Sequence, residues 1–112
     1  MTSADAAAIG GEAYRNCRSF LPMRINDAFL YGSYARGDFD ENSDVDILLT
    51  ADADAETLSA YRDQVAAVAS DLSLRHDVTV SLTIKPLRQF RRFAAVLPFY
   101  RNVYREGIRV DG

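Results

Sequence analysis

The residues of this chain whose types and spacing can do chemistry are a glycine–serine turn and a pair of aspartates. Gly32 and Ser33 open the run GSYARG, and Asp44 and Asp46 follow at the head of an apolar run. On a strand, residues two apart point to the same face, so the two carboxylates can reach one divalent cation together. A glycine-rich turn beside such a pair can hold phosphates with its backbone N–H groups. This combination is suited to a nucleoside triphosphate.

The first half of the chain is expected to supply a helix and two strands that position these residues. Apolar residues at helical spacing before Pro22 predict the helix, and the apolar run closed by Gly32 predicts the first buried strand. The pair Gly10-Gly11 separates the helix from a start that we expect to be frayed. The expected elements are a frayed start over 1–10, a helix over 12–21, strands over 28–31 and 44–50, a turn over 33–37 and a polar loop over 38–43.

The second half is expected to add two helices and a third strand. Apolar residues spaced by three and four predict a helix that Asp54 or Thr57 caps. Alternation of apolar and polar residues predicts a half-buried strand. The expected elements are a helix up to residue 72, a strand over 77–84, a helix over 86–97, a final segment over 98–107 and a short edge strand over 108–110.

This order predicts an α/β (α+β) fold in a single domain over residues 1–112. We expect a small mixed sheet with helices packed on one face. The polar faces of the second and third strands stay open, and an open polar face that carries carboxylates is where a site is expected.

Composition excludes several classes of protein. Of 112 residues, 48% are hydrophobic, enough for a core, and no apolar stretch approaches the length of a membrane span. The single cysteine, Cys17, cannot form an intrachain disulfide, which fits a reducing cytoplasm. The net charge of −3 argues against nucleic acid as a partner.

Charge is unevenly placed along the chain. Residues 38–56 hold eight acids and no base, whereas residues 88–109 hold six arginines and one acid, Glu106. Such an arginine stripe is most often a solvated helix face. Contact with nucleic acid or with an acidic partner is the alternative interpretation.

The motifs resemble the signature of the nucleotidyltransferase superfamily that includes polymerase β. That signature is Gly-Ser, about ten residues, and then Asp-x-Asp; here GSYARG is followed by SDVDIL. The Ala-Arg-Gly extension and the serine before the first aspartate are closest to the minimal nucleotidyltransferases. The segment from Pro98 to Val103, with Glu106-Gly107 after it, is also similar to the tail of some of these minimal proteins.

The resemblance implies a role for each motif residue. Ser33 and the backbone of Gly32 would hold phosphate oxygens of a nucleotide such as ATP. Asp44 and Asp46 would bind one or two Mg²⁺ ions, a cation that prefers oxygen ligands. The reaction implied is in-line displacement at the α-phosphorus, with pyrophosphate leaving.

Further positions follow from the same resemblance. Arg36 would reach a phosphate or brace the acidic loop, and Ser43 would contact the nucleotide or orient the region of Asp44. A third carboxylate, acting as metal ligand and general base, is expected on a later strand, where Asp77 is the available acid. Thr79 is the alternative occupant of that position, and a hydroxyl cannot replace a carboxylate as base.

The resemblance also suggests an acceptor. A minimal core without an acceptor domain needs a substrate that brings its own surface. The implied reaction is transfer of AMP from ATP to a hydroxyl of a partner protein, a HEPN-type toxin, which makes the chain an antitoxin. Two alternatives stay open: an antitoxin of the same fold that acts by binding alone, and a small-molecule nucleotidyltransferase of the aminoglycoside type, completed by homo- or hetero-oligomerisation.

Overall fold

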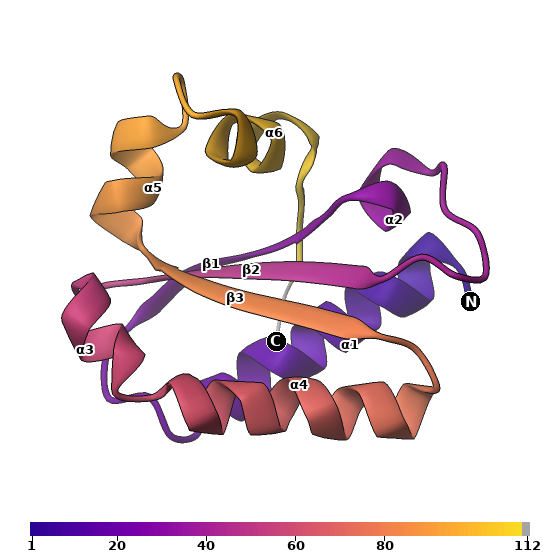
Figure 1. Ribbon diagram of the computed structural model, residues 1–112, viewed down its shortest axis with the longest axis horizontal. Coiled ribbons are helices and arrows are strands. Elements are labelled where there is room, and N and C mark those ends of the chain that lie inside the picture. Colours follow the sequence, from indigo (N-terminus) through magenta and orange to yellow (C-terminus); the bar gives the residue numbers. More distant parts are fainter. Residues whose placement is uncertain (111–112) are drawn as a thin grey trace.

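A four-stranded mixed sheet separates helices on its two faces in the computed structural model, which describes residues 1–110 (Figure 1). The strand order is β3-β2-β1-β4. Strand β1 (Ile25–Tyr31) is antiparallel to both β2 (Val45–Ala51) and β4 (Ile108–Arg109), and β2 is parallel to β3 (Val80–Pro86). The predicted mixed α/β sheet is therefore confirmed.

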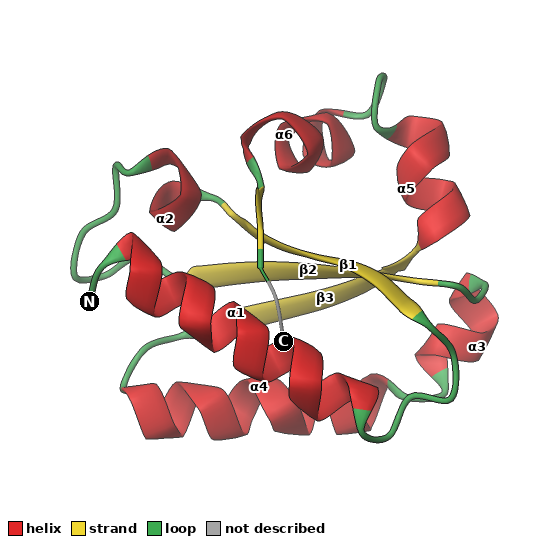
Figure 2. Ribbon diagram, turned by 180° about the vertical axis from the view of Figure 1, so that it is seen from behind, coloured by secondary structure: helices red, strands yellow, loops and turns green. Residues whose placement is uncertain are grey.

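Two long helices cover one face of the sheet. Helices α1 (Ser3–Arg18) and α4 (Arg62–His76) lie together on this side, as the front and back views agree (Figures 1 and 2). Between them and the sheet lies the main core, to which Ile9, Leu30, Ile47 and Leu72 contribute buried side chains. Burying this apolar surface is the main driving force for placing the helices here.

The opposite face carries a second helical layer, which corrects the expectation that helices pack on one face only. Helices α5 (Leu87–Phe93) and α6 (Pro98–Glu106) lie across it. Phe29 and Leu48 point to this side because side chains alternate along a strand. They form a smaller buried cluster with Phe90, Tyr100 and Val103. The polar parts of this face that stay open are the end of the sheet near Asp46 and the positions of Thr83 and Lys85 on β3.

Helix α1 begins much earlier than expected, so the prediction of a frayed start over residues 1–10 is wrong. The Thr2 hydroxyl accepts a hydrogen bond from the Asp5 N–H (3.1 Å), and the Thr2 N–H donates to the Asp5 carboxylate (2.8 Å), which closes a capping box. A Cβ at Gly10 would stand 3.0 Å from side-chain atoms of Ile47 and Val110. This glycine therefore serves close packing of helix on sheet and does not interrupt the helix.

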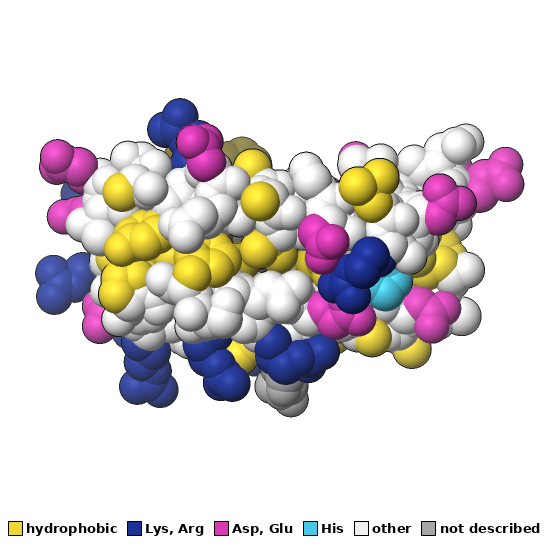
Figure 3. All heavy atoms as spheres, turned by 90° about the horizontal axis from the view of Figure 1, so that it is seen from below, with side chains coloured by type: hydrophobic (Ala, Val, Ile, Leu, Met, Phe, Trp, Pro, Cys, Tyr) yellow, Lys and Arg dark blue, Asp and Glu magenta, His cyan; other side chains and the backbone are white. Residues whose placement is uncertain are grey.

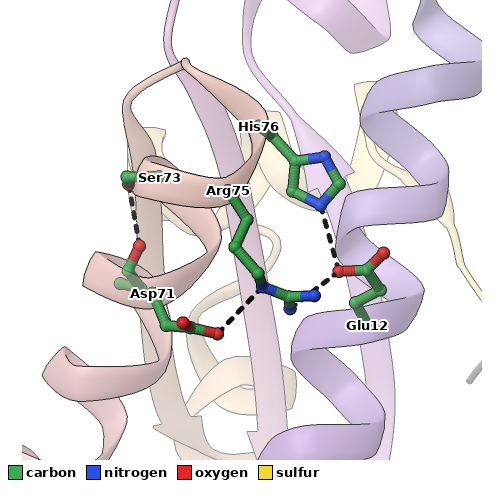
Figure 4. Close-up of polar contacts among 6 residues, drawn as sticks. Glu12, Asp71, Ser73, Arg75 and His76 are labelled. Carbon is green, nitrogen blue, oxygen red and sulfur yellow. Dashed lines mark hydrogen bonds and ion pairs between the residues drawn. The ribbon is translucent and has the colours of Figure 1, made fainter.

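Ion pairs tie α4 to α1 at the end of α4 (Figure 4). The Glu12 carboxylate on α1 lies 3.2 Å from Arg75 Nη2 and 3.1 Å from His76 Nε2, and Arg75 also contacts Asp71 at 3.0 Å. His76 is thereby occupied in a contact between helices. Figure 3 views this side from below and shows hydrophobic side chains gathered in a strip, with a group of charged side chains at its right-hand end.

The remaining elements refine the predicted boundaries. The single helix expected up to residue 72 is two helices, α3 (Ala55–Ser59) and α4, and Asp54 caps the first through the Thr57 N–H at 2.8 Å. Helix α2 (Ser33–Arg36) is a single turn after β1. Within residues 1–110, no helix combines the length and the apolar character that crossing a bilayer requires.

Candidate active site

The glycine turn and the second aspartate are in direct contact. Gly32 follows β1 with φ of 74° and precedes α2, a conformation that L side chains rarely adopt. A Cβ at this position would stand 2.3 Å from Oδ2 of Asp46. Glycine is therefore required here twice, for the backbone conformation and for the space that the carboxylate occupies.

The two aspartates lie at the start of β2. Asp46 pairs with Tyr31 of β1 and with Ser81 of β3, and it is partly buried, whereas Asp44 directly precedes the strand and is exposed. Burial raises the pKa of Asp46, and the nearby charge of Asp44 raises it further, while Arg36 acts in the opposite direction. The two carboxylates are thus close enough to repel each other, as expected for residues two apart on one face.

Tyr31 shares this face of the sheet. Burial and then the charge of Asp46 raise the pKa of the Tyr31 phenol, while the neighbouring Thr83 of β3 acts in the opposite direction. Its ring packs edge-on against Phe99 of α6, with the ring centroids 5.6 Å apart. Tyr31 therefore forms part of the wall between the sheet and α6 beside the carboxylate.

Tyr31 and Asp46 line one pocket of about 360 Å³, whereas Asp44 is not among its lining residues. From the β1–α2 turn and β2 come Tyr31, Gly32, Ser33, Arg36 and Asp46, so four of the sequence-predicted residues meet here. The facing wall is α6, which contributes four residues that sequence reasoning did not assign to the site: Phe99, Asn102, Val103 and Glu106. The only signal for them was the similarity of this segment to the tail of minimal nucleotidyltransferases.

Arg36 connects α2 with α6. Its Nε lies 3.2 Å from the Asp38 carboxylate and its Nη1 lies 3.5 Å from Glu106 Oε2, all at exposed positions. Of the two roles expected for Arg36, bracing the acidic loop is seen directly. Contact with phosphate stays a prediction, and the position of Arg36 in the pocket lining is compatible with it.

Ser43 closes the acidic loop. Its hydroxyl accepts a hydrogen bond from the Asp40 N–H at 2.9 Å. The orienting role is therefore the one that its contacts support, and nucleotide contact by Ser43 stays a prediction.

Asp77 is not on the third strand, and this part of the sequence-based interpretation is wrong. The residue ends α4 in the left-handed conformation, with φ of 52°, and β3 begins only at Val80. Aspartate tolerates this conformation better than most residues, which suits it to the turn from helix to strand. In the part of the chain that the structure describes, no three His, Cys, Asp or Glu side chains come together to hold one metal ion, so Asp77 does not complete a trio with Asp44 and Asp46.

Hydroxyl residues lie alongside the two aspartates, Thr79 just before β3 and Ser81 within it. The Val45 N–H donates to the Thr79 carbonyl at 2.8 Å, and Asp46 pairs with Ser81. Asp77 instead lines a separate pocket that contains Asp40 and Glu41. By this register Thr79, and not Asp77, lies beside the aspartates, and its correspondence to the third acid of relatives stays a prediction.

The donor set suits a hard divalent cation. Two carboxylates and the phosphates of a substrate are the ligands with which Mg²⁺ is commonly bound, because it retains several waters and needs few protein groups. The mutual repulsion that raises the pKa of Asp46 is relieved by a cation placed between the two aspartates. Asp44 and Asp46 are therefore the residues that fit a metal at this site.

Comparison with protein families matches residues 13–104 to the nucleotidyltransferase domain. The chain belongs to this family. Among curated proteins, this nucleotidyltransferase is 36% identical over 84 residues to "Putative protein adenylyltransferase MJ0604" of Methanocaldococcus jannaschii, covering 75% of this chain and 76% of that protein. It is also 36% identical over 70 residues to "Putative protein adenylyltransferase MJ0141" of the same organism, covering 62% of this chain and 69% of the relative.

Solved structures share the fold of this nucleotidyltransferase. A crystal structure of a toxin–antitoxin with AMP-PNP has a TM-score of 0.60 at 23% identity and covers 90% of this chain and 71% of that chain. A mutant of the toxin–antitoxin MntA-HpeT has a TM-score of 0.57 at 18% identity and covers 100% of this chain and 74% of that chain. The resemblance read from the glycine–serine turn and the aspartate pair is confirmed.

Proposed function

We propose that this nucleotidyltransferase transfers AMP from ATP, with Mg²⁺, to a hydroxyl group of a partner protein, and that it acts as an antitoxin toward a toxin of the HEPN type. The observation that carries the proposal is the contact between the glycine turn and Asp46, where a Cβ at Gly32 would stand 2.3 Å from the carboxylate. A phosphate held by the turn is then placed beside the metal-binding carboxylates. The protein adenylyltransferase names of the relatives support AMP as the group transferred, and the toxin–antitoxin neighbours support a toxin as partner.

Different residues at the site bind the phosphates, hold the metal and orient the nucleotide. The Ser33 hydroxyl and the first amides of α2, which have no acceptor inside the helix, hold the terminal phosphates. Asp44 and Asp46 hold Mg²⁺, which supplies charge neutralisation along the triphosphate when bound. The pocket walls from β1 and α6 orient the α-phosphorus toward the side that the partner approaches. The acceptor hydroxyl attacks the α-phosphorus in line: an O–P bond forms, the bond from the α-phosphorus to the oxygen that bridges to the β-phosphate breaks, pyrophosphate leaves, and the hydroxyl proton passes to solvent water.

A second function is favoured by the residues around the start of β3. Thr79 and Ser81 stand alongside the aspartates, and a hydroxyl is a poor general base near neutral pH. An antitoxin that binds Mg-nucleotide but neutralises its partner by contact alone is consistent with these positions. The two functions differ in whether the partner gains a covalent AMP.

The experiment mixes the chain with the protein encoded beside it, ATP labelled at the α-phosphate, and Mg²⁺, and follows label and mass in both proteins. Transfer of one or more AMP groups to the neighbour supports the enzyme. Asp46→Asn should lower the rate by on the order of a hundredfold or more, because a charge-stabilising ligand is lost, while Glu41→Gln in the exposed loop should not. Binding of the neighbour without any label would support the contact-only function and contradict the transfer.

A further inference from the structure

The segment from the end of α5 to β4 exposes apolar side chains. In the described part of the chain, seven large hydrophobic residues are exposed, and five of them lie in this segment. Val96 is 65% exposed and Tyr104 is 67% exposed, with Leu97, Phe99 and Ile108 each above 40%. Monomeric proteins rarely leave several such side chains together in water unless they bind something there.

Arginines without acidic partners surround these side chains. Arg88, Arg91 and Arg92 on α5 and Arg101 and Arg105 on α6 are exposed, and none of them forms an ion pair with an acid of residues 1–110. The one acid in this part of the sequence, Glu106, is already paired with Arg36. Asp52 and Asp54 of the loop after β2 line one pocket with Arg88 and Arg92, so the α5 part of this surface is mixed in charge. The α6 part, with Arg101 and Arg105, is positive on a chain whose net charge is −3.

Helix α6 joins this surface to the active-site pocket. Phe99, Asn102 and Val103 face the pocket, while Arg101, Tyr104 and Arg105 are exposed on the outer side of the same helix. Successive residues of a helix are turned by about 100°, so one nine-residue helix serves both sides. Helix α6 therefore carries both a wall of the pocket and part of this exposed surface.

We propose that this surface, formed by the exposed side chains of α5, the turn after it and α6, is the docking surface for the acceptor protein, and that it binds an apolar patch ringed by Asp and Glu side chains. The inference rests on the proposed function for the identity of the partner as acceptor. Charge complementarity fixes the chemistry of the partner, because unpaired arginines attract carboxylates. The aromatic and aliphatic centre with an arginine margin matches the composition of protein interfaces, whereas a phosphate backbone offers nothing to Val96 and Leu97.

The test uses the protein encoded beside this chain and measures its dissociation constant. Arg101→Glu combined with Arg105→Glu should weaken binding by about tenfold or more, and Val96→Asp should weaken it as well. The matched control is Arg15→Glu combined with Arg62→Glu, which makes the same change in net charge at exposed positions of α1 and α4. Binding of Mg-AMP-PNP should be unchanged in all of these variants, which shows that each remains folded.

Other outcomes overturn the proposal. Equal loss of partner binding in the Arg101/Arg105 and Arg15/Arg62 variants, or no binding by the wild-type chain, would exclude this surface. Loss of binding to a labelled single-stranded RNA, with partner binding intact, would assign it to nucleic acid instead. Asp46→Asn should keep full partner binding. If the wild type binds the partner but transfers no AMP, the proposed function fails and the docking surface stands. If AMP is transferred and the Arg101/Arg105 variant binds the partner as tightly as the wild type, the docking surface fails and the proposed function stands.

Discussion

At the scale of single residues, Asp46 is destabilising until it has a cation. Its pKa is raised by burial and by Asp44, so the folded chain holds a proton there more tightly than the unfolded chain does. The resulting stabilisation is present below the ordinary carboxyl pKa and is lost as the pH rises through the raised pKa. At neutral pH we therefore expect Asp46→Asn to raise the melting temperature of the metal-free protein by about 1–4 °C, a small effect because the group is half exposed.

The same substitution should remove Mg-ATP binding, whose affinity in the wild type rises with pH through the raised pKa of Asp46. Thermal melts and titration calorimetry across pH 4–8 measure both effects. Glu41→Gln, at an exposed loop position, is the control that should change neither. A lower melting temperature for Asp46→Asn would contradict the inference that the charged Asp46 carboxylate destabilises the metal-free protein.

Gly32 and Gly37 form a matched pair for a second prediction. Both have positive φ, 74° and 88°, but a Cβ at Gly37 would meet nothing within 4 Å, whereas one at Gly32 would meet the Asp46 carboxylate. Gly37→Ala should cost about 1–2 kcal/mol for the left-handed conformation. Gly32→Ala should cost about 1–3 kcal/mol, because its ψ of −154° lies in a region that is nearly reserved for glycine. Only Gly32→Ala should also abolish Mg-nucleotide binding. Urea unfolding and calorimetry compare the two variants, and equal nucleotide affinity would contradict the contact between turn and carboxylate.

At the scale of elements, the turn from α4 to β3 decides the role of Asp77. Because Asp77 ends α4 in the left-handed conformation, Asp77→Gly should stabilise the fold by about 0.5–1 kcal/mol, and Asp77→Ala should destabilise it. Both variants should keep AMP transfer within about twofold, since neither change alters the pocket that contains Asp46. Denaturant unfolding and the transfer assay provide the measurements. A large loss of AMP transfer in Asp77→Gly, despite its higher stability, would show that Asp77 takes part in the reaction.

The same turn shows which elements the sequence predicts and which it does not. The mixed sheet, the glycine turn and the aspartates follow from local patterns, because each depends on spacing within one element. The start of β3 does not follow from such a pattern. Asp77 and Thr79 continue the polar–apolar alternation of the strand, but Asp77 ends α4 in the left-handed conformation and β3 begins only at Val80. The start of α1 was missed for a related reason: Gly10 is read as a helix breaker, but its contact with Ile47 is tertiary. The α6 wall was missed because which face of a sheet a helix covers is set by packing.

At the scale of the whole molecule, the pocket joins two distant parts of the chain. One wall is the β1–α2 turn with β2, and the other is α6, some seventy residues further along the sequence. The exposed ion pair between Arg36 and Glu106, at 3.5 Å, is the polar connection between them. A pair so exposed contributes little to stability. If Arg36 contacts phosphate as predicted, we expect the larger effect of the pair to be on nucleotide binding, because Glu106 holds the guanidinium in the ligand-free protein.

Removing Glu106 should therefore strengthen nucleotide binding. In the ligand-free protein, two carboxylates compete with phosphate for Arg36, and Glu106→Gln removes one of them without changing the size of the side chain. We expect the KM for Mg-ATP to fall about two- to fivefold, the range that an exposed ion pair can supply, with little change in melting temperature. Arg36→Gln should raise the KM instead, and in that background Glu106→Gln should have no further effect, because the competition needs the arginine. Steady-state transfer kinetics on the four proteins complete this double-mutant cycle. Additive effects of the two substitutions would show that Glu106 acts on the nucleotide directly, through its own charge at the pocket, and not through Arg36.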